Sequence, residues 1–326
     1  MACSNKWCAY KLVDCESALK DALSELKISL KSKHNNLLAV DCEGVRLSRK
    51  GALTIITVAI KEKTYIFDVV KLGQAVFREG LGEMLEDESV EKLMFDCRED
   101  SDALWHQFNV KLTGVLDLQL LEIIYSREKF TAAQFNFTLL GVRNIEKIKG
   151  FAHCLELYVQ DENLMRMKNT GRQLLQHDHK TWQMRPLSDT LLEYCMVDTM
   201  GMFKLYDKLQ RTYTKQQARL RIASKRYADM LRSRPERLYD EFEKNAFLPL
   251  DIIPDDLGSP EFDLADTVCT GCRRLFRRQE FNAMELNKEE QKCRVCKQVT
   301  RRADERWGRL GGSIAVPTFQ IFDDTK

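Results

Sequence analysis

Features that mark membrane-spanning and secreted proteins are missing from this chain of 326 residues. No apolar run approaches the roughly 20 residues that a membrane-spanning helix needs. The first twenty residues, MACSNKWCAYKLVDCESALK, lack the basic-then-apolar layout of a secretory signal. We therefore expect an intracellular location, cytoplasmic or nuclear, in a reducing environment, and no membrane partner.

The chain also has little net charge, so total charge does not indicate a nucleic-acid partner. Its formal net charge is +2, but Lys and Arg are concentrated in two stretches, residues 204–237 and 273–309. Such stretches attract a phosphate backbone through charge pairing and counterion release. The plain alternative, a solvent-exposed helix face, stays open.

A disulfide framework is absent although the chain has eleven cysteines. Four of them form two C-x-x-C pairs near the C-terminus, and the other seven have no paired spacing. Several of the seven, including Cys42 and Cys195, lie in apolar segments, where a free cysteine behaves as a small hydrophobic residue. Disulfides are therefore not expected to stabilise this fold.

The order of apolar patterns predicts an α/β domain followed by a smaller module. We expect strands at residues 10–13, 37–42, 53–60, 64–69 and 92–95; after residue 101 the pattern is mainly helical, apart from a short apolar run at 114–118. We expect helices after residue 14, around 76–85, over 187–209 and over about 210–243. The predicted organisation is an α/β domain (1–215), a basic helix and linker (216–262), a cysteine module (263–310) and a tail (311–326).

Two carboxylates, Asp41 and Glu43, lie at the end of the strand expected at residues 37–42. Side chains at positions i and i+2 of a strand point to the same side, so these two project together. Paired carboxylates at the end of a central strand are costly unless a cation binds them, and Mg²⁺ or Mn²⁺ suits oxygen ligands. Gly44 is expected to leave room for a substrate. A D-x-E pair alone occurs by chance in many proteins.

A second acidic element is the segment FDCREDS at residues 95–101, where a strand leads into a helix. Four carboxylates compete for a site role there: Asp96, Glu99, Asp100 and Asp102. The alternative is that they only complement the helix dipole, which favours acidic residues in the first turn. Local sequence does not choose among them.

The third element is Tyr194 with Asp198, four residues apart in the apolar segment LLEYCMVD. Positions i and i+4 lie on one face of a helix, so the phenol and the carboxylate point the same way. A simple Tyr–Asp pair at the surface is the alternative.

Together, the order and spacing of these elements resemble the DEDD exonuclease superfamily in its tyrosine-bearing subclass. The stretches VDCEGVRL, FDCREDSDALWHQFNVKL, VLDLQLLE and WQMRPLSDTLLEYCMVD resemble the branch that contains the Egalitarian protein and ribonuclease D-related exonuclease-domain proteins. The resemblance covers about residues 10–210. It implies a ribonuclease H-like mixed sheet flanked by helices, and degradation of nucleic acid from the 3′ end.

The resemblance also implies roles for five residues. Its metal-binding carboxylates fall on Asp41, Glu43, Asp100 and Asp198, and its tyrosine falls on Tyr194. In a two-metal mechanism with Mg²⁺ or Mn²⁺, Asp41 is expected to bridge both ions. Glu43 and Asp198 are expected to hold the ion that activates water, with Asp100 assisting the other. Tyr194 is expected mainly to orient the attacking water, because a phenol with a pKa near 10 is a poor base.

Two further positions follow from the same resemblance. Phe95 stands where relatives often carry histidine or asparagine, a position that is not a metal ligand in the family. Asp117 matches a recurrent family aspartate, for which we expect a structural role.

Near the C-terminus, two C-x-x-C pairs predict a zinc module. Cys269, Cys272, Cys293 and Cys296 are four thiolates at a spacing that can surround one tetrahedral Zn²⁺. Gly271 suits the tight turn of the first pair. A redox C-x-x-C is disfavoured because the pairs lie outside a βαβ context. Nucleic-acid contact, protein docking and a purely structural role remain open for this module.

The primary hypothesis is a metal-dependent 3′–5′ exonuclease that acts on single-stranded nucleic acid, with RNA favoured over DNA. The alternative is a non-catalytic RNA-binding adaptor with the same fold. A third hypothesis is an interaction protein that docks partners through its zinc module.

Overall fold

The computed structural model describes residues 9–31, 36–134, 148–177, 179–233, 252–253, 267–271, 275–276, 278, 281–293 and 296–297. The chain divides into two compact units, Met1–Ser259 and Pro260–Lys326, and each is described by itself. No helix in these described ranges is both long enough and apolar enough to cross a membrane.

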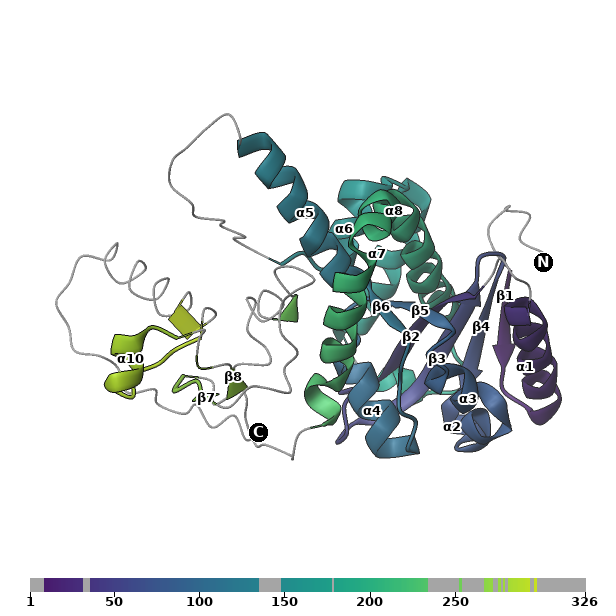
Figure 1. Ribbon diagram of the computed structural model, residues 1–326. Coiled ribbons are helices and arrows are strands. Elements are labelled where there is room, and N and C mark those ends of the chain that lie inside the picture. Colours follow the sequence, from purple (N-terminus) through teal and green to yellow (C-terminus); the bar gives the residue numbers. More distant parts are fainter. Residues whose placement is uncertain are drawn as a thin grey trace. The chain divides into compact units, whose positions relative to one another are not determined.

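A six-stranded mixed sheet forms the centre of the first unit (Figure 1). Its strands are β1 (Ala9–Val13), β2 (Leu37–Val45), β3 (Ala52–Ile60), β4 (Lys63–Asp68), β5 (Glu91–Met94) and β6 (Val115–Asp117). Their order is β1-β4-β3-β2-β5-β6; β3 is antiparallel to β2 and β4, and the remaining pairs are parallel. Each predicted strand is present, and the predicted α/β class with a mixed sheet is confirmed.

Helices cover this sheet. They are α1 (Glu16–Lys31), α2 (Val69–Leu72), α3 (Gly82–Glu86), α4 (Arg98–Phe108), α5 (Leu118–Gln134), α6 (Phe151–Cys154), α7 (Glu162–His177) and α8 (Asp189–Arg232). Helix α1 buries the predicted face of Leu19, Leu23 and Leu26. The helix expected at residues 76–85 is irregular, since a π-helical turn, η1 (Phe77–Leu81), precedes α3 and Gly80 has a φ of 132°. The same kind of turn, η2 (Leu155–Val159), follows α6, and a 3₁₀ turn, η3 (His179–Gln183), follows α7.

Helix α8 joins the two helical segments expected at 187–209 and 210–243. It continues to Arg232 with one departure from helical geometry at Gln216, and residues 234–243 lie outside the described residues. Beyond Gln216 the helix buries Leu220 and Tyr227, so only part of its surface is the solvated basic face considered from sequence. The expected end of the α/β domain at residue 215 therefore lies inside a continuous helix of the first unit.

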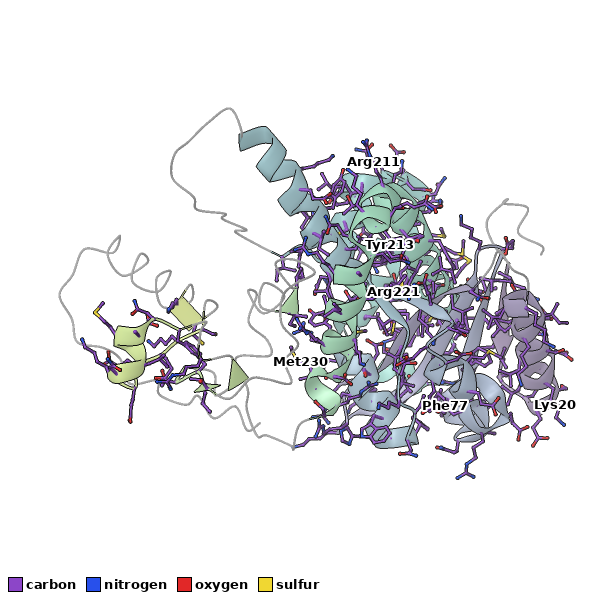
Figure 2. The ribbon with its side chains drawn as sticks, viewed as in Figure 1. Lys20, Phe77, Arg211, Tyr213, Arg221 and Met230 are labelled. Atoms are coloured by element: carbon purple, nitrogen blue, oxygen red, sulfur yellow. The ribbon has the colours of Figure 1, made fainter. Side chains whose placement is uncertain are left out.

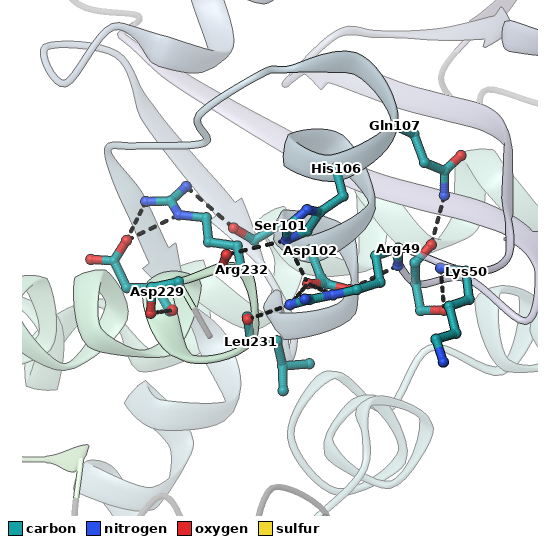
Figure 3. A network of polar contacts seen from close by, with 11 residues as sticks. Arg49, Lys50, Ser101, Asp102, His106, Gln107, Asp229, Leu231 and Arg232 are labelled. Atoms are coloured by element: carbon teal, nitrogen blue, oxygen red, sulfur yellow. Dashed lines mark hydrogen bonds and ion pairs between the residues drawn. The ribbon is translucent and has the colours of Figure 1, made fainter. Parts of the chain in front are cut away.

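Contacts along α8 hold it to the sheet and to α4. The hydroxyl of Tyr213 donates to Glu91 at the start of β5 (3.1 Å), and Arg221 is paired with the same carboxylate; Figure 2 labels both α8 residues. At the end of the helix, Arg49 donates to the carbonyl of Leu231 (2.7 Å; Figure 3). Arg232 donates to the carbonyl of Leu112 (2.5 Å). These bonds fix α8 at both ends of its second half.

In the second unit, the described elements are β7 (Thr267–Val268), β8 (Leu275–Phe276) and α10 (Ala283–Asn287). Strands β7 and β8 pair antiparallel. The side chain of Asn282 accepts a hydrogen bond from the backbone of Met284 and caps α10. The expected linker around residues 254–260 and the tail at 311–326 lie outside the described residues.

Candidate active site

Three carboxylates from two elements meet at one place in the first unit. Asp41 and Glu43 lie on β2, and Asp198 lies on α8. Oxygen atoms of these three side chains all lie within 4.8 Å of one another. The packing of α8 against β2 thus brings Asp198 next to Glu43, although the two residues are 155 positions apart in the sequence.

Gly44 next to this cluster is required by the sheet itself. A β-bulge lies between Glu43 and Gly44, and a Cβ on Gly44 would lie 1.9 Å from the carbonyl oxygen of Ala52 on β3. The close neighbour of Gly44 is thus its own sheet, whereas the sequence interpretation assigned the space to a substrate.

Asp100 lies beside the cluster, in the first turn of α4. Its side chain is 8% exposed, and its Oδ1 accepts a hydrogen bond of 3.0 Å from the backbone N–H of Cys42, between Asp41 and Glu43. It is not one of the three carboxylates whose oxygens lie within 4.8 Å of one another. Its charge nevertheless helps to raise the pKa of Asp41, so it belongs to the same electrostatic environment.

The other three carboxylates of this segment point elsewhere. Asp96 forms a two-point ion pair with Arg98, at 2.5 and 2.6 Å. Asp102 is paired with Arg49, with Nη2–Oδ1 at 2.8 Å (Figure 3), and Glu99 is exposed. Of the four acidic candidates, Asp100 is therefore the one that contacts β2.

Asp117 supports the placement of Asp100. Its Oδ2 accepts from the backbone N–H of Cys97 (2.9 Å), immediately before α4, and its Oδ1 accepts from that of Gln119 (2.9 Å). Burial raises the pKa of Asp117 to about 6. These bonds join β6 to the turn that starts α4, which is a structural role.

Tyr194 packs tightly between α7 and the turn η3. A Cβ on Gly171 of α7 would lie 2.3 Å from the Cδ2 atom of Tyr194, and the ring of Trp182 lies 6.3 Å from that of Tyr194, centroid to centroid. Burial, reinforced by the charge of Asp198, raises the pKa of the Tyr194 phenol above its usual value. The phenol is therefore a hydrogen-bond donor at neutral pH.

Gly171→Ala is expected to displace Tyr194, because the added methyl group has no space. We expect kcat for 3′-end hydrolysis to fall by roughly 10²-fold, since displacements of about 1 Å in an active site cost that much. Binding of Mn²⁺ should remain, because Gly171 does not contact the carboxylates. Steady-state kinetics beside a Mn²⁺ titration separates the two; a Gly171→Ala protein with unchanged kcat would contradict the expected role of the Tyr194 position.

Lys168 of α7 was missed in the sequence interpretation. The residue is 4% exposed, and its Nζ is paired with Oδ1 of Asp198. The same Nζ lies 4.9 Å from the ring centroid of Phe151 and 4.8 Å from that of Tyr194. The sequence did carry a signal: Leu164, Lys168, Gly171 and Leu175 form the buried stripe of α7, and lysine is out of place in such a stripe.

Phe95 packs against Phe151, one of the two aromatic rings next to Lys168. Its ring lies 5.0 Å from that of Phe151, with an interplanar angle of 47°. The phenylalanine at this position therefore makes an aromatic contact that a histidine or asparagine side chain would replace with a polar one.

Burial and mutual repulsion make the carboxylate cluster expensive without cations. Burial, followed by the charges of neighbouring carboxylates, raises the pKa of Asp41 and of Glu43 well above the usual range, and the ammonium of Lys168 acts in the opposite direction. Burial raises the pKa of Asp100 to about 7. Oxygen ligands in this arrangement fit hard divalent ions such as Mg²⁺ or Mn²⁺, which favour the ionised carboxylates.

Asp100→Asn is expected to stabilise the metal-free protein, increasingly so as pH rises. A carboxyl whose pKa is raised in the fold costs stability when it ionises, so the cost is absent below its unfolded pKa near 4 and complete above about 7. Each pKa unit corresponds to about 1.4 kcal/mol, so the variant should be more stable than the wild type by a few kcal/mol at pH 8 and equal to it near pH 4. Urea unfolding of both proteins in chelator across this range measures the difference; a constant difference would contradict the assigned pKa.

In the second unit, three cysteines converge. The sulfur atoms of Cys269, Cys293 and Cys296 lie within 4.8 Å of one another, whereas Cys272 lies outside the described residues. The backbone N–H of Cys293 donates to the sulfur of Cys269 (3.2 Å). A Cβ on Gly271 would lie 2.8 Å from the sulfur of Cys296, so glycine allows this approach. Three sulfurs at this separation fit a tetrahedral Zn²⁺ that takes a fourth ligand.

Comparison with known proteins identifies the family and the fold of the first unit. A family model described as "3'-5' exonuclease" matches residues 10–213. The human "piRNA biogenesis protein EXD1" is 30% identical over 174 residues, which cover 53% of this chain and 32% of that protein. The "Egalitarian protein homolog" of Caenorhabditis elegans is 22% identical over 131 residues, covering 40% of this chain and 23% of that protein. The chain thus spans about a third or less of the length of these two relatives.

Solved structures share the fold. Trypanosoma brucei RNase D in complex with RNA U12 aligns with a TM-score of 0.57 and 22% identity, over 82% of this chain and 91% of that one. The GMP complex of the same RNase D aligns with a TM-score of 0.56 and 23% identity, over 82% of each chain. At this identity the likeness establishes the RNase D-like fold, and the expected resemblance to ribonuclease D-related proteins is confirmed at that level.

Proposed function

Since the chain belongs to the 3′–5′ exonuclease family, we propose that it hydrolyses phosphodiester bonds of single-stranded nucleic acid from the 3′ end. The observation that carries this proposal is the convergence of Asp41, Glu43 and Asp198, with Asp100 bonded to the strand between the first two. Half-buried and buried carboxylates with raised pKa values, gathered in one place, are characteristic of sites built for cations and reaction chemistry.

We assign the roles as follows. Asp41, Glu43 and Asp198 hold Mg²⁺ or Mn²⁺, and Asp100 completes the set. When bound, two such ions supply stabilisation of the attacking and leaving oxygens of the displacement. Tyr194, protonated in its packed position, donates a hydrogen bond that orients the attacking water.

RNA is the favoured substrate class. The relatives that support it are named for piRNA biogenesis, and the T. brucei RNase D was solved with an RNA oligonucleotide. The basic face of α8, with exposed Arg211, Lys215 and Lys225, is available to a phosphate backbone.

For the second unit, we propose that Cys269, Cys272, Cys293 and Cys296 hold one Zn²⁺. The exonuclease domain at 1–215, the helix and linker at 216–262 and the zinc module at 263–310 remain our proposed organisation. A protein partner bound through the zinc module and an intracellular location are parts of the same proposal.

A non-catalytic RNA-binding adaptor remains the second candidate because of one observation. The ammonium of Lys168 is paired with Asp198, so one of the carboxylates is engaged by the protein itself. An adaptor would bind RNA without needing that carboxylate for a metal ion.

The test uses 5′-labelled single-stranded RNA and DNA of one sequence with the full chain. With Mg²⁺ or Mn²⁺, we expect a ladder that shortens from the 3′ end, faster on RNA, and absent in chelator and in an Asp41→Ala/Glu43→Ala protein. Intact RNA that is nevertheless bound, with either metal ion, would favour the adaptor.

A further inference from the structure

Lys168 is a buried cation held from several sides. Its Nζ is paired with Asp198 and lies within 5 Å of the centroids of two aromatic rings, those of Phe151 (4.9 Å) and Tyr194 (4.8 Å). Aromatic faces attract an ammonium through the ring quadrupole, and the attraction is stronger where water is excluded. With only 4% of the residue exposed, this ammonium is a fixed part of the site.

The charge of Lys168 acts on the whole carboxylate cluster. It opposes the rise in pKa of both Asp41 and Glu43, so it is close enough to compensate their charges as well as that of Asp198. In the protein without metal ions, the ammonium of Lys168 therefore compensates part of the negative charge that divalent cations would compensate in the metal-loaded protein. This contact helps to explain how three carboxylates, one buried and two half-buried, are tolerated in one place.

A divalent ion and this ammonium have the same sign and seek the same carboxylate. Repulsion between like charges is strong in a site from which water is excluded. An ion bound by Asp198 is therefore repelled by the ammonium paired with its Oδ1, and this repulsion lowers the affinity for the ion unless the ammonium moves to another anionic partner.

We propose that Lys168 competes with a divalent ion for Asp198, and that the phosphodiester at the 3′ end of the substrate receives the displaced ammonium. This inference rests on the proposed function. Metal loading then becomes coupled to the arrival of nucleic acid: the substrate makes the ion bind more tightly, and the ion makes the substrate bind more tightly, because such coupling is reciprocal.

The test measures Mn²⁺ binding by the free-ion signal in electron paramagnetic resonance, on the full zinc-loaded chain. Without nucleic acid, Lys168→Met should bind Mn²⁺ on the order of tenfold to a hundredfold more tightly than the wild type, the usual size of such couplings. An oligonucleotide whose 3′-terminal linkage resists hydrolysis should raise the Mn²⁺ affinity of the wild type and change that of Lys168→Met much less.

Three further variants make the result specific. Lys168→Arg keeps the charge and should keep the weak, substrate-dependent Mn²⁺ binding. Lys204→Met removes a lysine that is paired with Asp161 (2.6 Å) elsewhere in the first unit and should behave as the wild type. If Lys168→Met does not fold, Lys168→Gln removes the same charge and keeps a polar side chain.

Equal or weaker Mn²⁺ binding by the neutral variants would overturn the inference, and so would an equal effect of the oligonucleotide on all variants. Absence of binding by every variant, wild type included, would also overturn it. Because binding is measured without cleavage, the coupling can be present in a protein that never shortens RNA. That result would support the role of Lys168 and reject only the exonuclease activity.

Discussion

Asp41→Asn is expected to reduce the rate of 3′-end hydrolysis by on the order of a thousandfold. Asp41 lies at the centre of the cluster: its pKa is raised by burial and by both Asp198 and Asp100, so it lies near all of the proposed ligands. An amide keeps the shape of the side chain but removes a negative charge that the divalent ions need. Single electrostatic stabilisers in active sites are worth roughly 10²–10³-fold in kcat, and a ligand shared by two ions belongs at the upper end.

The fold should not suffer from this substitution. Asp41 is a half-buried carboxylate repelled by its neighbours, so its removal relieves repulsion in the metal-free protein, and the melting temperature should stay equal or rise. Asp21→Asn, which changes an exposed aspartate of α1 paired with Lys11, is the matched control and should retain full activity. The measurement is the initial rate of shortening of 5′-labelled RNA in Mg²⁺ and Mn²⁺.

Retained activity in Asp41→Asn would contradict the assignment of Asp41 to the active site, since the cleavage would then come from other residues or from a contaminating nuclease. An inactive variant that has also lost its melting transition would report unfolding. The Asn variant is preferred to Ala for this reason, because it leaves the smallest change in volume on β2.

The periodicities of the sequence predicted which side chains share one face of an element, but not which elements meet. A spacing of two on a strand puts Asp41 and Glu43 on the same side, and that pair does converge with Asp198 on α8. The same reasoning holds for the mixed sheet, since β3 and β4 were recognisable as a hairpin of β-branched residues and pair antiparallel. These features depend on local repeats, which a single sequence displays.

Asp100 could not be chosen from local physics, because the discrimination is made by distant residues. Asp102 is removed from the site by Arg49, 53 positions away in the sequence, and Asp100 is held by the backbone of Cys42, 58 positions away. Only the resemblance to the family indicated Asp100. Contacts with such distant residues cannot be predicted from the acidic segment alone.

For Lys168, in contrast to Asp100, the local sequence did contain an indication of a buried charge, and the sequence interpretation missed it. A lysine in the stripe formed by Leu164, Gly171 and Leu175 is anomalous for a helix that faces a core, since lysine is almost never fully buried unless paired. Its partner, Asp198, lies 30 positions further along the chain. A charged residue within the apolar stripe of a helix therefore predicts a buried partner of opposite charge.

Cys293→Ser is expected to unfold the described part of the second unit, the other large effect that follows from the structure. Among the described residues of that unit, the buried ones are Cys269, Phe281 and Cys293, so two of three are proposed zinc ligands and apolar packing is slight. Structural zinc contributes about 10–16 kcal/mol in small modules of this kind, far more than so small a core supplies. Serine removes a thiolate from the converging sulfurs and leaves too few strong ligands.

Zinc content by mass spectrometry under native conditions, together with limited proteolysis, gives the readout. The wild type should carry one Zn²⁺ and resist cleavage over residues 267–297, whereas Cys293→Ser and chelator-treated wild type should lose both properties. The first unit should keep its melting temperature, because its buried core is built from its own strands and helices. Cys15→Ser, at an exposed cysteine outside the module, should keep the zinc and the resistance. A Cys293→Ser protein that stays protected without zinc would mean that packing alone holds β7, β8 and α10 together, and the convergence of three sulfurs would then need another explanation.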